Sequence, residues 1–275
     1  MAQEYAQRGY LHEDVRLFQL TGSMEEQLDW HYHTFHKLIF FLGGQSSYGI
    51  EGRSYPLEPG DVIFVPQGCV HRPEAVPGAP YERVILYLSA DYLAREGSAA
   101  CALDACFSLA KERFRFVLRA QTQRRALFRT LDELEQAQQP GYGQRELSHA
   151  ILVQLLIRLR RAMDEQPQPV ESLAADEKIA AIMQYLSQNA TEAVSIDDLA
   201  ARFYISKYHM MRRFRAETGY TIHAYLISKR LVLARERIAA GMPVMQAATV
   251  CGFGDYSAFC RAYRRQFGQP PSSAR

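Results

Sequence analysis

Residues 252–267 read GFGDYSAFCRAYRRQF and carry the clearest structural pattern in the chain. It predicts a glycine-containing turn followed by a helix with two different faces. Phe259 and Tyr263 share an apolar stripe of this helix, while Arg261 lies on a polar and basic stripe. A shorter helix is predicted directly upstream, over residues 244–251. A helix, a tight turn and a second helix with a basic outer face are typical of a helix-turn-helix, whose second helix enters the major groove of DNA.

The same pattern recurs one structural unit upstream. Ser195 is the predicted N-cap of a first helix, as Asp255 is of the last one, and Ser206 opens a second helix after a short turn. A displacement of 49 residues places Arg212 on Arg261, and it places the aromatic residues two positions further along on each other. A repeat that retains both the apolar and the basic stripe indicates two copies of one DNA-binding unit.

Both units resemble the DNA-binding domain of the AraC/XylS family, and the resemblance covers roughly residues 176–275. The first unit carries the family pattern in Ile196, Leu199, Ala200, Ser206, Met210, Arg212, Arg213, Phe214, Gly219, Lys229, Arg230 and Leu231. The second unit carries it in Gly252, Phe253, Asp255, Ser257, Phe259, Arg261, Tyr263, Gly268, Pro270 and Pro271. One departure is Ala247, where the family usually has a larger aliphatic residue. The resemblance implies a helical domain with two helix-turn-helix units.

The basic stripes predict which residues face DNA. Arg212 and Arg261 are expected to read base edges, whereas Lys207, Arg215 and Arg264 are expected to contact phosphates. The full predicted set is Ser206, Lys207, Tyr208, Met211, Arg212, Arg215, Tyr256, Ser257, Arg261 and Arg264. From residue 171 onward the chain holds 14 Lys and Arg against 9 Asp and Glu, whereas the remainder holds 18 against 21. Only the C-terminal part is therefore basic, which favours double-stranded DNA as its partner.

The composition describes an ordinary soluble protein of two domains. The chain has 275 residues, and single cores usually stop growing near about 250 residues. Its 48% hydrophobic and 23% charged residues are typical of globular domains. No apolar run approaches the roughly 20 residues that span a bilayer, and the N-terminus lacks a signal-like segment. The five cysteines lack CxxC spacing. A cytoplasmic protein with reduced thiols and no membrane partner is predicted.

The first ~90 residues predict short β-strands separated by glycine and proline. Glu51 and Gly52 form a predicted hairpin turn. The predicted strands are residues 37–42, 46–50, 53–55, 61–65 and 83–88. Strands of this length with no helical period between them favour a closed or double-sheet β-structure.

Two histidine-containing segments bracket these strands. On a strand His31 and His33 point to the same face, so both would enter one barrel interior, and His71 follows a turn rich in proline and glycine. The two segments resemble the two characteristic motifs of cupin barrels, and specifically the small-molecule sensing half of AraC-type regulators. The resemblance implies an α+β chain of two domains. A cupin-like β-barrel with appended helices would precede the all-α tandem helix-turn-helix domain.

These histidines have two interpretations. In the first they line an effector pocket, whose predicted residues are His31, His33, Lys37, His71 and Arg72. The two cations would face a sugar or an anionic metabolite. In the second interpretation the histidines are polar fillers of a small barrel mouth. Metal-binding cupins hold a divalent ion with an HxH pair, a following Glu and a later His, but Lys37 occupies the place of that Glu. A cation beside a metal raises the cost of binding, so no metal and no cofactor is predicted, with His31, His33 and His71 as the alternative metal ligands.

Between residues 104 and 165 the apolar residues recur at the spacing of an α-helix. Helices are predicted over residues 123–137 and 144–163. The second has an apolar stripe wide enough to cover the barrel and still offer an edge to a second subunit. A homodimer through residues 144–163 is therefore predicted, with simple docking on the chain's own barrel as the alternative.

A Pro-interrupted polar segment, residues 166–175, is the predicted linker between domains. It would separate a sensing and dimerisation domain, residues 1–165, from a DNA-binding domain, residues 176–275. The barrel is expected over about residues 1–92 and the appended helices over about residues 104–165.

The predicted function is sequence-specific DNA binding by a transcription regulator that a small-molecule effector controls from the barrel. The sequence contains no recognisable nucleophile–base pair or pair of carboxylates, so the chain is not expected to be an enzyme. Two alternatives stay open at this point. One is a metal-dependent cupin enzyme fused to a DNA-binding domain, and the other is a constitutive DNA binder whose barrel only dimerises.

Overall fold

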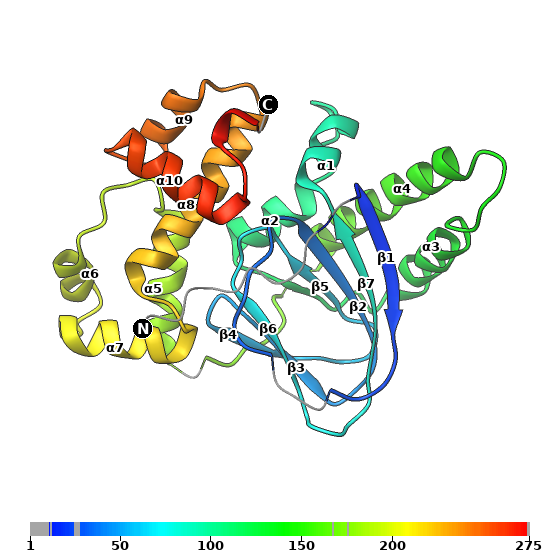
Figure 1. Cartoon of the computed structure of the whole chain (residues 1–275). Coiled ribbons are helices and arrows are strands. Elements are labelled where there is room, and N and C mark those ends of the chain that lie inside the picture. The colour runs from blue at the N-terminus through cyan, green and yellow to red at the C-terminus, as the bar shows by residue number, and fades with distance from the viewer. Residues whose placement is uncertain (1–10, 12, 25–27, 167, 175, 274–275) are drawn as a thin grey trace.

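The computed structural model describes residues 11, 13–24, 28–166, 168–174 and 176–273. Its N-terminal part holds two antiparallel sheets that share one hydrophobic core (Figure 1). The larger sheet contains, in spatial order, β1 (Val15–Leu20), β7 (Tyr81–Leu88), β2 (His36–Gly44), β5 (Val62–Val65) and β8 (Val117–Leu118). The smaller sheet contains β4 (Arg53–Pro56), β3 (Ser46–Ile50) and β6 (His71–Ala75). Within the described ranges the strand ladders form these two sheets and no closed ring, so the β-structure is a double sheet.

The five predicted strands all form, close to their predicted bounds. The first six residues of β2 are buried, because the strand is covered by the second sheet on one side and by helices on the other. Glu51 and Gly52 have φ angles of 49° and 79°, the positive values that a two-residue hairpin turn requires. The sequence analysis did not identify β1, β6, β8 or the helices α1 (Ala90–Glu96) and α2 (Ala105–Arg113). β1 is a half-exposed edge strand, and a half-exposed edge leaves only a weak apolar pattern.

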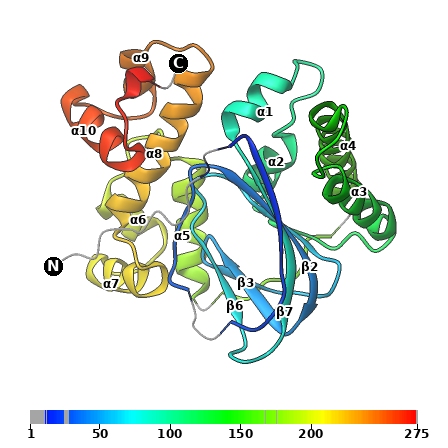
Figure 2. The same ribbon diagram turned by 45° about the vertical axis from the view of Figure 1, so that its right-hand side comes forward.

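Helices α3 (Arg124–Gln136) and α4 (Gln144–Glu165) lie on the side of the sheets away from the C-terminal helices (Figures 1 and 2). The buried residues of α4 pack into the chain's own core, and they are Leu152, Leu155, Leu156, Leu159, Ala162 and Met163. Only the start of the predicted stripe stays open, where Leu147 is 54% exposed. Most of the apolar stripe therefore covers this chain, and only its start is left as an edge for a second subunit.

The C-terminal part is entirely helical apart from its turns. It contains α5 (Glu177–Gln188), α6 (Ile196–Arg202), α7 (Lys207–Thr218), α8 (Ile222–Ala239), α9 (Val244–Val250) and α10 (Tyr256–Phe267). The N-terminal half of α8 packs into the core of the α6–α7 unit, and its C-terminal half packs into the core of the α9–α10 unit. Both predicted N-caps form. Ser195 Oγ accepts from the N–H groups of Asp197 and Asp198, and Asp255 Oδ1 accepts from Ala258 N–H at 3.0 Å.

The N-terminal sheets and the C-terminal helices are in direct contact. Tyr32 and Val70 of the N-terminal part are buried in the core around α5 to α8. Gly68, at φ +72°, lies so close to α8 that a Cβ there would stand 2.7 Å from Val232 Cγ2. The segment before α5 also pairs with the smaller sheet, because Leu173 and Ser54 exchange two backbone hydrogen bonds. No helix among the described residues is long and apolar enough to cross a membrane.

Candidate DNA-binding surface and effector site

The second helix of each unit, α7 or α10, presents its polar stripe to solvent. Met210 and Phe214 of α7 and Phe259 and Tyr263 of α10 have fully buried side chains. All ten residues of the predicted DNA face are exposed, and they are Ser206, Lys207, Tyr208, Met211, Arg212, Arg215, Tyr256, Ser257, Arg261 and Arg264. A recognition helix needs this separation, because one stripe must anchor the helix while the other reaches DNA.

Two basic residues of this surface already have protein partners. Lys207 Nζ lies 2.9 Å from the Asp197 carboxylate. The Arg212 guanidinium lies 3.5 Å from a ring nitrogen of His209 and 6.0 Å from the ring centroid of Tyr208. These contacts are solvent-exposed and therefore weak, so a phosphate or a base edge can replace them.

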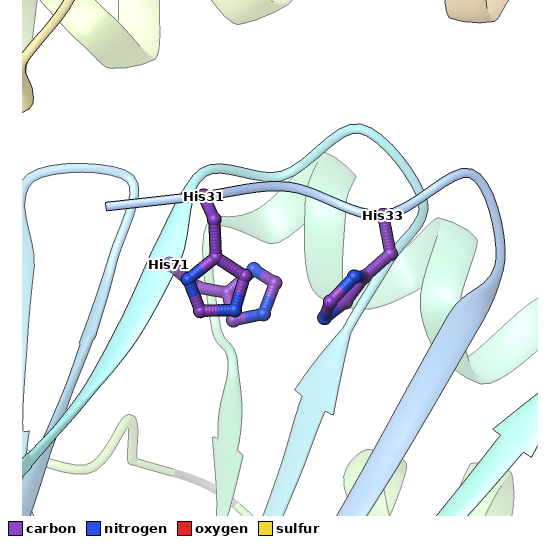
Figure 3. A group of neighbouring side chains, drawn as sticks. All are labelled: His31, His33 and His71. Carbon is purple, nitrogen blue, oxygen red and sulfur yellow. The ribbon is translucent and has the colours of Figure 1, made fainter. Parts of the chain in front are cut away.

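His31, His33 and His71 come together at one place, and we call them the histidine cluster (Figure 3). All three side chains are buried, and one ring nitrogen of each lies within 4.8 Å of the others. Their ring centroids are 4.4 to 5.1 Å apart, so the rings are in van der Waals contact. The backbones of His31 and His71 exchange two hydrogen bonds of 3.1 and 2.9 Å, which hold the two distant segments in register.

Hydrogen bonds fix the tautomers of two of these rings. His31 Nδ1 lies 2.8 Å from the Asp29 carbonyl oxygen, and His71 Nδ1 lies 2.9 Å from the Cys69 carbonyl oxygen. A carbonyl only accepts, so each Nδ1 carries the proton and each Nε2 carries a lone pair. Burial is the main cause that lowers the pKa of His71 well below its ordinary value, and the His33 and His31 rings lower it further. The His71 ring is therefore neutral near pH 7.

Lys37 of β2 lies beside the histidine cluster and is only 7% exposed. Burial, reinforced by Arg83, lowers the pKa of Lys37 to about 7. Its Nζ lies 5.8 Å from the Tyr87 ring centroid, and its charge acts on His71. The structure therefore keeps Lys37 with the three histidines, as the sequence analysis expected.

Arg72 does not join this group. Its guanidinium lies 4.6 Å from the Trp30 ring centroid and 3.0 Å from the Glu74 carboxylate. Adjacent residues of a strand point to opposite faces, so the side chain of Arg72 leaves β6 on the side opposite to that of His71. This corrects the prediction that Arg72 lines the same pocket as His71.

A buried polar network connects the loop before His71 to α8. Lys229 Nζ donates to Glu51 Oε1 at 2.8 Å and to the Gly68 carbonyl oxygen at 2.9 Å, and the Tyr225 hydroxyl donates to Glu51 Oε2. Val70 N–H also donates to Glu51 Oε1, at 2.7 Å. Burial acts against the charge of Lys229, but Glu51 and further partners outweigh it and raise the lysine pKa, so Lys229 stays protonated. We call this network the Glu51–Lys229 contact.

The sequence analysis did not assign a functional role to any side chain of this contact. Glu51 was expected only as a turn residue, and Lys229 only as part of a family pattern. One signal was present. Lys229 lies in the apolar stripe of α8, four residues after Tyr225, and a lysine at such a position needs a buried acceptor.

Comparison with known protein families identifies both parts of the chain. The AraC-like ligand binding domain family matches residues 19–156, which is half of the chain, and a helix-turn-helix domain family matches residues 199–275. The chain belongs to the AraC family. It is therefore a DNA-binding transcription regulator with a ligand-binding domain, and the predicted α+β fold class of two domains is confirmed.

AraC-family relatives match along most of their length. "Probable transcriptional regulator LumQ" of Photobacterium leiognathi is 25% identical over 256 residues, which cover 91% of this chain and 93% of that protein. "HTH-type transcriptional activator RhaS" of Escherichia fergusonii is 28% identical over 254 residues, covering 89% and 86%. The crystal structure of a "probable AraC family transcriptional regulator" from Rhodopseudomonas palustris shares 28% identity and covers 36% of this chain and 94% of that chain, with a TM-score of 0.35. The relatives are named as regulators, which agrees with the prediction that the chain is not an enzyme.

Proposed function

We propose that a ligand at the histidine cluster and Lys37 controls how α7 and α10 engage DNA. The observation that carries this proposal is the Glu51–Lys229 contact, in which buried Lys229 of α8 holds the loop that leads into His71. A ligand that displaces His71 also displaces Val70 and Gly68, and these backbones provide two of the hydrogen bonds of the contact. Because α8 packs into the cores of both helix-turn-helix units, its position sets both recognition helices.

The physical basis is a shift between two arrangements of the sensing and DNA-binding parts. A ligand changes the populations only by its difference in affinity for the two arrangements. A buried ion pair between the two parts suits this role. It is stable only in the geometry that brings both charges together, and a buried charge that loses its partner is strongly destabilising.

The test uses Lys229→Met and Glu51→Gln in the full chain. A thermal-shift screen of sugars, carboxylates and metal ions identifies a ligand, and DNA affinity is then measured with and without it. We expect both variants to bind the ligand while their DNA affinity no longer depends on it. Arg235→Gln is the matched control, because Arg235 pairs with Asp91 across the same interface at 3.5 Å but is more exposed. A full ligand response in Lys229→Met contradicts the proposal.

The DNA-binding domain is proposed to comprise residues 176–275, after a linker of residues 166–175 and a sensing domain of residues 1–165. Its cores consist almost entirely of its own residues, with Tyr32 and Val70 as the buried additions from the sensing side. Expressed alone, this fragment should be helical and bind DNA with a strong salt dependence, since phosphate contacts release counterions. Circular dichroism and a salt-titrated binding assay test this, and a folded fragment that ignores DNA contradicts the division.

We also propose a homodimer that forms through the exposed start of α4. The proposed location is the cytoplasm, where the protein can reach DNA. Leu147 is exposed there and Tyr142 is exposed in the turn just before the helix, although most of the predicted stripe is buried in the chain. Sedimentation of the full chain and of Leu147→Glu tests it. We expect a dimer that dissociates in the variant, and equal masses contradict this interface.

A further inference from the structure

We infer that the histidine cluster binds one divalent transition-metal ion of the Zn²⁺ type, and that this ion is the ligand that regulates DNA binding. The second half of this inference rests on the proposed function. The first half rests on the cluster alone.

The donor set has the chemistry that a metal ion needs. His31 and His71 each donate Nδ1–H to a backbone carbonyl, so each Nε2 carries a lone pair rather than a proton. Metal-bound histidines almost always make such a second hydrogen bond, because it sets the tautomer and orients the ring. His71 Nε2 is buried and has no hydrogen-bond partner among the described residues. An ion at the cluster would satisfy this atom.

The space between the rings fits an ion better than an organic molecule. The ring centroids are at most 5.1 Å apart, so the rings already touch, and a sugar does not fit between them. The ligand nitrogens lie within 4.8 Å of one another. Tetrahedral zinc at about 2.0–2.1 Å from each nitrogen brings its ligands to roughly 3.3 Å of one another. Binding therefore requires the nitrogens to approach by up to about 1.5 Å, through rotation of the rings and a shift of the backbone that carries them.

Three imidazoles without a carboxylate or thiolate favour zinc among the common ions and leave one tetrahedral position open to water. Lys37 sets how tightly the ion is held. When Lys37 is protonated its charge repels the ion, which weakens binding and suits an ion that exchanges rather than one that is held permanently.

The ion has a direct structural route to the DNA-binding helices. His71 follows Val70, whose N–H donates to Glu51 Oε1, and the same carboxylate oxygen accepts from Lys229. Closure of the three rings moves the His71 backbone relative to Glu51. The geometry of the Glu51–Lys229 contact then depends on whether the ion is bound.

The first experiment measures binding with tag-free full-length protein that has been stripped by a chelator. Titration with Zn²⁺ should reveal one saturable site per chain, and Co²⁺ should give the absorption bands of a tetrahedral site. His33→Ala and His71→Ala should weaken binding by more than about 100-fold, since outer-shell partners alone contribute roughly 10- to 100-fold. His36→Asn, at a buried histidine outside the cluster, should bind as the wild type does. Lys37→Met should bind Zn²⁺ more tightly than the wild type, because the positive charge that Lys37 carries when protonated is removed.

Unsaturable binding, or equal binding by wild type and His71→Ala, overturns the metal site. The cobalt spectrum of the wild type decides the question independently if a histidine variant fails to fold. The second experiment measures DNA affinity with and without Zn²⁺, where we expect a change of at least 5-fold, on the order of a typical allosteric coupling, in the wild type and none in His33→Ala. Tight zinc binding with unchanged DNA affinity overturns the ion as regulator. If an organic compound changes DNA affinity while zinc does not bind, the proposed function stands and this inference fails.

Discussion

Lys229 Nζ lies 2.8 Å from Glu51 Oε1, although 178 residues separate them and their side chains are only 4% and 1% exposed. The pair joins the hairpin turn of the sensing domain to the helix shared by both helix-turn-helix units. The Tyr225 hydroxyl and Val70 N–H donate to the same carboxylate. Burial and the Glu51 carboxylate raise the pKa of Tyr225 well above its ordinary value, so the phenol remains a donor. Both buried charges are therefore balanced by each other and by hydrogen bonds to protein groups, without a need for water.

The first prediction concerns the energy of this pair. Lys229→Met or Glu51→Gln alone should lower the free energy of unfolding by about 3–5 kcal/mol, because one partner of a buried pair is removed. The double variant should recover much of this loss, since neither charge then lies buried alone. Urea denaturation of the four proteins measures the coupling. Additive losses in the double variant would show that the two residues act independently.

A second prediction separates two kinds of DNA contact. Arg212→Ala and Arg261→Ala should each cost about 1–3 kcal/mol on the specific site and relax the preference at a few base pairs. Arg264→Ala should instead weaken binding to all sequences and reduce the salt slope by about one unit. Salt-titrated binding to specific and random DNA distinguishes the classes. Equal losses on both DNAs for all three variants contradict the assignment.

A third prediction compares two helix N-termini. Asp255 Oδ1 accepts from Ala258 N–H, whereas the Ser206 side chain makes no capping hydrogen bond at the start of α7. Asp255→Ala should therefore destabilise the α9–α10 unit by about 0.5–2 kcal/mol, and Ser206→Ala should cost less than about 0.5 kcal/mol. Ser206→Ala should still weaken DNA binding if this hydroxyl contacts DNA. Thermal unfolding of both variants, with a DNA-binding assay, checks the pair.

A fourth prediction follows from His36, whose ring packs at a tilt against Phe107 with 4.3 Å between ring centroids and accepts from Gln67 N–H. Burial, reinforced by Lys111, lowers the pKa of His36 to about 3. The unfolded chain takes up a proton near pH 6.5, whereas the folded chain does so only near pH 3. The stability from neutral His36 is thus complete above about pH 6.5 and falls as the pH drops toward 3.

His36→Asn retains an acceptor for Gln67 N–H but does not titrate. Between about pH 6 and pH 5 it should lose about 1 kcal/mol less unfolding free energy than the wild type. The other buried histidines contribute equally to both proteins, so the difference isolates His36. Parallel pH dependences of the two proteins would mean that His36 does not set this loss.

Local sequence signals were sufficient to predict most of the individual helices and turns. Helices such as α7 and α10 were predictable because helical periodicity, N-caps such as Ser195 and Asp255, and the repeated basic stripe all act within a few residues. The hairpin at Glu51 was predictable for the same reason. The histidine cluster was predictable as a group, since the two motifs that carry it were recognisable.

Tertiary structure alone decided which distant groups meet. The side of β6 that Arg72 occupies depends on the pairing of β6 with β3, and a shift of one residue would have reversed it. The role of Glu51 depends on the docking of α8 against a turn that precedes it by 178 residues. The same holds for α4, whose stripe has the right width for either a partner or its own core. Apolar periodicity predicts that a helix face is buried, but it does not identify the surface that covers this face. Only the packed structure shows whether that surface belongs to the same chain or to a partner.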